Sequence, residues 1–218
     1  MENTTATLLV PAYFIQVVAG TAILAWWFLG RKDSVLNTFG IGMAGYSLGV
    51  AAWTMLVLTK PYDLQPLILA GAIPFLLANF AFAKVAYKNL DFTKTSLLSL
   101  LVIGTIAGTF FVRTFLYPSE PYFSSDGLLF FGLHPLSIAF YIATMSLTFL
   151  PAISVAADHV KKGSLRTFIK VGLTTLFINS IILVSGNDGT LLLINGVIMT
   201  VALLVLWVKV ITTPAKQI

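Results

Sequence analysis

A histidine and a proline interrupt an apolar run, FFGLHPLSIAF at residues 130–140. His134 carries an imidazole that can titrate near neutral pH and can donate or accept hydrogen bonds. Inside a helix, Pro135 would free the carbonyl of Phe131 and bend the chain. The pair predicts a polar position within an apolar segment. In the competing interpretation, His134 only bonds that carbonyl or a neighbouring helix and fixes packing.

Four further polar side chains fall inside apolar stretches: Arg113, Asn179, Asn195 and Gln16. Each alone is explained by a hydrogen bond between two helices. An ionisable group in such surroundings also indicates a functional site, because its burial costs free energy. Together with His134, these residues predict a polar pocket that binds a small ligand. The cation of Arg113 favours a neutral or anionic ligand.

The residue types also argue against several kinds of chemistry. The apolar stretches hold no Asp or Glu, so a proton relay or a cation site is not expected. The chain has no cysteine, and its histidines, His134 and His159, are too far apart for a shared metal site. No serine has a histidine and an acid arranged beside it. We therefore expect a protein that is not an enzyme and that uses no metal or cofactor.

The composition indicates what must position these residues. Hydrophobic residues make up 58% of the 218 residues and charged residues only 10%, with a mean hydropathy of +0.94. A water-soluble domain of this composition would expose a very large apolar surface. We expect a multi-pass integral membrane protein of the plasma membrane whose main partner is the lipid bilayer. The net charge of +5 does not predict nucleic-acid binding, since no soluble domain is expected.

Seven stretches are long and apolar enough for a transmembrane helix, which needs about 20 residues. They run over Leu8–Leu29, Leu36–Leu58, Leu64–Tyr87, Ser96–Tyr117, Gly127–Ala157, Leu165–Ser185 and Thr190–Ile211. The sequence thus predicts an all-α fold, a single seven-transmembrane helix bundle over residues 1–218. Short polar connections such as GRKDS and SGNDG make successive helices antiparallel.

Lysine and arginine are distributed unevenly between the two ends of the predicted spans. With the N-terminus outside, eleven of the thirteen lie at inner ends: Arg31, Lys32, Lys84, Lys88, Lys94, Lys161, Lys162, Arg166, Lys170, Lys209 and Lys216. Only Lys60 and Arg113 lie toward the outside. Because cytoplasmic loops retain basic residues, the sequence predicts an N-out, C-in orientation. No basic signal region precedes the first span, which we expect to be permanent.

A weak internal similarity links the two ends of the chain. At an offset of 125, Asp63 aligns with Asp188, Gly71 with Gly196 and Lys84 with Lys209. The similarity favours parallel repeats over residues 8–88 and 128–211, joined by a linker helix at 96–117. Chance matching of apolar helices is the alternative.

This layout of three helices, one helix and three helices resembles that of sugar-efflux and PQ-loop transporters. Microbial rhodopsins share the number and the direction of the helices. The residues depart from both patterns: Gln65 and Pro66 stand in reverse order, and Lys209 lies near the end of its span instead of the middle. We assign no family.

Glycines and prolines within the predicted spans indicate how the helices pack and where they bend. Gly42, Gly45 and Gly49 favour close helix packing. The same stretch, GIGMAG, has the glycine spacing of a dinucleotide loop, but that loop needs a preceding strand. We expect three prolines to act as hinges, Pro74, Pro135 and Pro151.

Asn3 begins a glycosylation sequon in the N-terminal segment. Asn3 would be glycosylated only in a eukaryotic secretory pathway, and the alternative is a short polar tail.

The predicted function is a small-solute membrane transporter or channel with an outward-facing polar pocket. One alternative is a heptahelical sensory or receptor-type protein that signals through a separate partner. The other is a non-catalytic subunit of a membrane complex. Only a short segment follows the last span, so we expect no output domain there. The sequence leaves open whether a homo-oligomer or another membrane protein completes the assembly.

Overall fold

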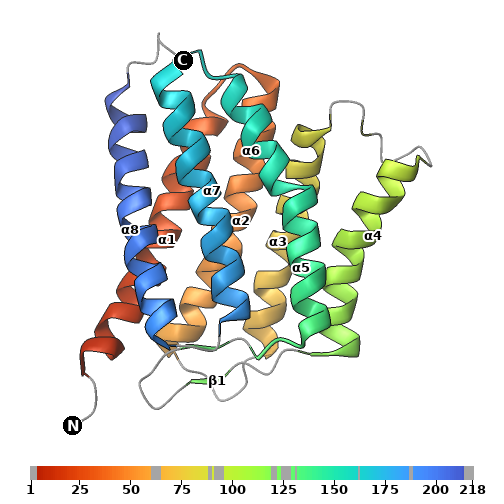
Figure 1. Ribbon diagram of the computed structural model, residues 1–218, viewed down its shortest axis with the longest axis vertical. Helices are drawn as coiled ribbons and strands as arrows, with labels where there is room; N and C mark the ends of the chain where they lie inside the picture. Colours follow the sequence, from red (N-terminus) through yellow and green to blue (C-terminus); the bar gives the residue numbers. More distant parts are fainter. Residues whose placement is uncertain are drawn as a thin grey trace.

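The computed structural model describes residues 4–59, 65–87, 90, 96–118, 122–123, 129–130, 132–161, 163–186 and 189–213. Its elements, in order, are α1 (Thr4–Leu29), α2 (Ser34–Thr59), α3 (Gln65–Ala86), α4 (Leu97–Phe111), the π-helix η1 (Val112–Leu116), β1 (Tyr122–Phe123), β2 (Leu129–Phe130), α5 (Pro135–Leu147), α6 (Phe149–Asp158), α7 (Gly163–Ser185) and α8 (Gly189–Thr212) (Figure 1). Asn3 lies outside the described residues.

Six helical segments are long and apolar enough to cross a membrane. They are Ser34–Met55, Leu69–Ala86, Leu97–Leu116, Pro135–Asp158, Gly163–Ser185 and Ile194–Thr212. A shorter apolar helix, Ile15–Leu29, lies within α1. The predicted helical membrane fold is confirmed to this extent. The seventh span, the orientation and the repeat stay predictions.

The helices run side by side along a common axis (Figure 1). Successive helices α1, α2 and α3 pack together, α6 packs on α3 and α7, and α8 closes on α1. Helix α4 stands at the side, against α3 and α5. Strands β1 and β2 form a short antiparallel ladder at what we call the hairpin end of the bundle. The opposite, basic end carries the turns after α1 and α6.

Aromatic side chains fill the centre between α2, α3 and α6. Phe39, Phe82 and Phe149 are each at most 1% exposed. The ring centroids of Phe82 and Phe149 are 4.7 Å apart, and those of Tyr46 and Phe149 are 6.1 Å apart. Such large buried rings make a close-packed apolar centre that fixes α6 against the first helices.

Glycines bring α2 and α3 together, as the sequence predicts. A Cβ atom at Gly45 would stand 2.9 Å from the carbonyl oxygen of Pro74. A Cβ atom at Gly42 would overlap the ring of Phe82, and one at Gly49 the ring of Phe75. The close packing expected from these glycines is confirmed, and it lies inside a helix instead of in a dinucleotide loop.

The fifth predicted span differs from the structure at its start. Helix α5 begins at Pro135, and not near Gly127. His134 is the N-cap, because its Nδ1 accepts a hydrogen bond from the backbone N–H of Leu136 at 3.2 Å. Pro135 is well suited to the first turn, where its missing N–H removes no helical bond. The kink expected at Pro135 is therefore wrong, and His134 precedes the helix instead of lying inside it.

The break in this span comes later, at Thr148, between α5 and α6. Pro151 has no N–H to offer to the carbonyl of Leu147. The hydroxyl of Tyr87 donates to this carbonyl instead, at 2.8 Å. The Thr148 hydroxyl lies 2.7 Å from Oδ1 of Asn79. One side chain of α3 and one from the residue after it thus stabilise the break near Pro151, whereas α3 itself continues through Pro74.

Candidate functional site

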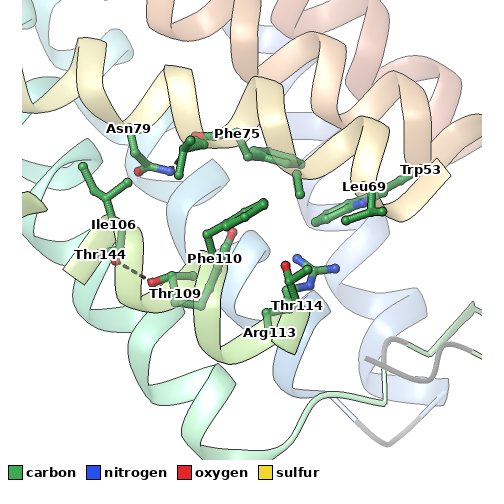
Figure 2. A pocket seen from close by; sticks show the side chains of 13 residues that line it. Trp53, Leu69, Phe75, Asn79, Ile106, Thr109, Phe110, Arg113, Thr114 and Thr144 are labelled. Carbon is green, nitrogen blue, oxygen red and sulfur yellow. Dashed lines mark hydrogen bonds between the residues drawn. The ribbon is translucent and has the colours of Figure 1, made fainter. Parts of the chain in front are cut away.

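A small cavity lies between α2, α3, α4, η1 and α5, toward the hairpin end. Its volume is about 60 Å³. A buried water needs roughly 10–15 Å³ on this measure, so the cavity has room for about four to six waters. Its described lining is Trp53, Leu69, Ala72, Phe75, Leu76, Asn79, Ile106, Thr109, Phe110, Arg113, Thr114, Tyr141 and Thr144. Arg113 and Trp53 lie at one side of the cavity and Asn79 and Thr144 at the other (Figure 2).

Arg113 projects from the π-helix η1, where α4 is wound more loosely. Short π-helical turns occur often at functional sites. The guanidinium carbon of Arg113 is 5.5 Å from the centroid of the Trp53 ring, within the range of a cation–π interaction. The residue is only half-buried as a whole, but its Nε and Nη2 atoms are shielded from solvent. In the part of the chain that the structure describes, neither atom has a hydrogen-bond partner.

Three other polar side chains of the lining, Thr109, Thr144 and Asn79, are hydrogen-bonded to protein. The hydroxyls of Thr109 and Thr144 are 2.8 Å apart (Figure 2), and Thr109 also donates toward the carbonyl of Phe140 at 3.0 Å. Nδ2 of Asn79 donates to the carbonyl of Phe75 at 2.8 Å. Arg113 therefore stands out as a buried cation with open donors.

Asn179 and Asn195 bond each other across α7 and α8. Nδ2 of Asn179 is 3.3 Å from the carbonyl oxygen of Asn195, and Nδ2 of Asn195 is 3.4 Å from that of Asn179. Asn179 also borders a second space of about 10 Å³, shared with Tyr46 and Ser180. That space holds at most about one water. These contacts join helices, as in the alternative interpretation, and a ligand-binding role for both residues stays a prediction.

Gln16 and His134 also lie away from the Arg113 cavity. Oε1 of Gln16 accepts a hydrogen bond from the hydroxyl of Thr200 at 3.1 Å, joining α1 to α8. His134 is exposed and stacks on Tyr117, with ring centroids 3.8 Å apart and planes within 6°. This stacking connects the start of α5 with the residue that follows η1. The structure thus places Arg113 in the lining of the cavity and does not bring the other four predicted residues into that lining.

Trp53 and Tyr141 are cavity residues that the sequence analysis did not select. Trp53 lies six residues before the end of α2, roughly 9 Å inside the helix end. The other tryptophans, Trp26, Trp27 and Trp207, lie closer to a helix end. That difference in depth was a signal that could have found Trp53. Thr109 and Thr144 carried none, because threonines in apolar helices commonly bond their own backbone.

The chain is a helical integral membrane protein by the length and composition of its spans. Among the described residues, no group of three His, Asp or Glu could hold a metal ion. No protein family, curated protein or solved structure matches the chain. Its function must be argued from the cavity.

Proposed function

We propose that the protein is a small-solute transporter or channel and that the Arg113 cavity is its binding site. The buried Nε and Nη2 atoms of Arg113, which have no hydrogen-bond partner among the described residues, carry this proposal. A guanidinium without a protein acceptor or a counter-charge is costly to bury. A solute with acceptor oxygens in the adjoining cavity would supply the missing partners.

The cation of Arg113 selects for neutral or anionic solutes, and the volume limits them to a few atoms. In the proposed N-out orientation, the hairpin end faces the outside of the plasma membrane. Arg113 lies in η1, the turn that follows α4, and α4 runs toward the hairpin end (Figure 1). A solute would then enter the cavity from outside.

We propose that α6 moves relative to α5 at the break between the two helices. Asn79 lines the cavity and also contacts the Thr148 hydroxyl at the break. A solute that accepts a hydrogen bond from Nδ2 of Asn79 would compete with the carbonyl of Phe75 and turn the amide. This rotation would weaken the contact with Thr148 and free α6 to shift. Pro151 keeps the break from closing into a continuous helix. We therefore retain Pro151 as a hinge.

Solute flux through liposomes that contain the purified protein tests the proposal. Swelling is followed by light scattering with glycerol, urea, formate and acetate in turn. We expect at least one solute to enter faster than in protein-free liposomes, and Arg113→Ala to slow that entry by about tenfold. Arg31→Ala is the matched control, since Arg31 also lies over a tryptophan, with its Cζ 4.1 Å from the Trp27 ring centroid. An unchanged rate in Arg113→Ala contradicts the proposed site.

The same preparations separate transport from the alternatives. A sensory protein would show no flux and would co-purify with a stoichiometric soluble partner. A complex subunit would show no flux and would co-purify with membrane proteins. Either result would replace the proposed function.

A further inference from the structure

We infer that the ligand of the Arg113 cavity is a small monocarboxylate, held by both oxygens on one edge of the guanidinium. This inference rests on the proposed binding site and names the class of its ligand. Three features of the site support it: the identity of the two open donors, the charge of the lining and the volume of the cavity.

The two open donors of Arg113 lie on the same edge of the guanidinium. Nε and Nη2 each point one N–H bond away from that edge, and the two bonds run parallel. Their spacing matches the two oxygens of a carboxylate, which binds arginine in this bidentate way. Both atoms are buried and without a hydrogen-bond partner in the described part of the chain. The open edge therefore presents two parallel N–H donors, which we call the fork. A single-atom anion such as chloride would accept from both with poorer geometry.

The charge of the site fits one negative charge. The described lining holds one cation, Arg113, and no Asp or Glu. The two acids among the described residues, Asp33 and Asp158, lie at the basic end of the bundle, far from η1 (Figure 1). A monovalent anion would neutralise Arg113, whereas a doubly charged phosphate would leave a net negative charge in a site of low dielectric constant.

The size and surface of the cavity limit the rest of the ligand. Room for about four to six waters favours a small acid. Formate and acetate, with three and four non-hydrogen atoms, fit it more easily than butyrate, which has six. Leu69, Phe75 and Phe110 present apolar surface beside the fork. A methyl group opposite the carboxylate would pack against them without losing a hydrogen bond.

Calorimetric titration of the full-length protein in detergent with sodium acetate at pH 7 tests the inference. Acetamide serves as the neutral ligand of the same shape, sodium chloride as the single-atom anion and sodium butyrate as the longer acid. Arg113→Lys keeps the positive charge and removes the parallel donors. Arg31→Lys is the matched control, because Nε of Arg31 already donates to the carbonyl of Trp27 at 3.1 Å.

We expect saturable binding of acetate that is at least tenfold tighter than that of acetamide, chloride or butyrate. Arg113→Lys should weaken acetate at least tenfold, and Arg31→Lys should leave it unchanged. An unchanged thermal unfolding midpoint of Arg113→Lys shows that the variant is folded. Equal affinity for acetate and chloride, or full affinity in Arg113→Lys, overturns the inference.

The inference and the proposed function can fail separately. Flux that depends on Arg113 without acetate binding would keep the transporter and reject the carboxylate. Saturable acetate binding without flux of any solute would keep the carboxylate site and reject transport. Absence of both would reject both.

Discussion

The two sides of the bundle treat buried polar groups in opposite ways. On the side of α1, α7 and α8, the side chains of Gln16, Asn179 and Asn195 are bonded to neighbouring helices. On the side of α2 to α5, Arg113 faces a cavity with two donors open. Residues of similar polarity thus serve assembly on one side and are available for a ligand on the other.

This difference follows from what each side chain can reach. An asparagine can both donate and accept, so two of them facing each other satisfy one another through side chain and backbone. Arginine has only donors and needs acceptors that an apolar helix pair rarely has free. In the described part of the chain, the hydroxyls of Thr109 and Thr144 bond each other and the carbonyl of Phe140. No described acceptor is within hydrogen-bond reach of Nε or Nη2 of Arg113.

The largest expected effect comes from a substitution that forces α2 and α3 apart, where they form one wall of the cavity. Gly45→Val should lower the free energy of unfolding by about 3 kcal/mol, because its side chain would meet the Pro74 carbonyl, 2.9 Å from a Cβ. The control is Gly104→Ala on α4, where no atom lies within 4 Å of a Cβ; it should stabilise by up to about 1 kcal/mol. Thermal unfolding in detergent measures both. Equal midpoints for the two variants would show that α2 and α3 do not pack this closely.

Arg113→Met should stabilise the protein by about 2 kcal/mol in the absence of ligand. It removes buried donors that lack a partner and keeps most of the apolar volume. Acetate should raise the unfolding midpoint of the wild type and leave that of Arg113→Met unchanged. A loss of stability in Arg113→Met would mean that Arg113 serves assembly, as Asn179 does, and would remove the contrast between the two sides.

Asn195→Leu should destabilise the protein by about 1 kcal/mol, because it breaks the pair with Asn179. The double variant with Asn179→Leu should cost less than the sum of the single variants, since each one already breaks part of the same pair. Solute flux should change little in the folded variants. A strong loss of flux at unchanged stability would support the predicted ligand-binding role of Asn179 and Asn195.

The sequence predicted well those features that depend on the thickness of the bilayer or on the face of a single helix. Apolar length predicted the six supported spans, because a helix must match the thickness of the bilayer. Glycine spacing predicted the α2–α3 contact, because it depends on one helix face. The position of His134 was wrong because hydropathy extended the fifth span through Gly127–Leu133, which the helix does not include. An apolar residue before a helix and one inside it look alike in sequence.

The cavity itself was predictable only in part. Arg113 was selected for its charge, but its contact with Trp53 joins α2 to η1 across sixty residues of chain. Which polar side chains find partners depends on helix rotation, and no residue spacing gives the rotation of two distant helices. Arg113 and Asn195 therefore looked equivalent in the sequence and differ in the structure.

The smallest expected effect concerns a third polar pair, at the basic end, outside the spans. Asp33 accepts hydrogen bonds from the N–H groups of Val35 at 2.8 Å and Leu36 at 3.0 Å, and its Oδ2 is 2.9 Å from Nδ1 of His159. Burial alone would raise the pKa of Asp33, but the hydrogen bonds from His159 and the backbone and the charge of His159 lower it below 3.8.

Because this pKa is lower in the folded protein, the pair should stabilise it above about pH 4, and the contribution should disappear as the pH falls through the folded value. Both side chains are 38% exposed, so solvent screening limits the contribution to about 0.5 kcal/mol. Asp33→Asn keeps the N-cap acceptor but not the charge, and its unfolding midpoint should fall less between pH 5 and pH 3 than that of the wild type. Asp158→Asn at the same end removes a second carboxylate whose pKa is lowered, by a hydrogen bond from Lys170, and should reduce the fall in the same direction. Parallel curves for wild type and Asp33→Asn would mean that solvent screens this exposed pair completely, and that polar pairs contribute to the stability of this bundle only where its helices bury them.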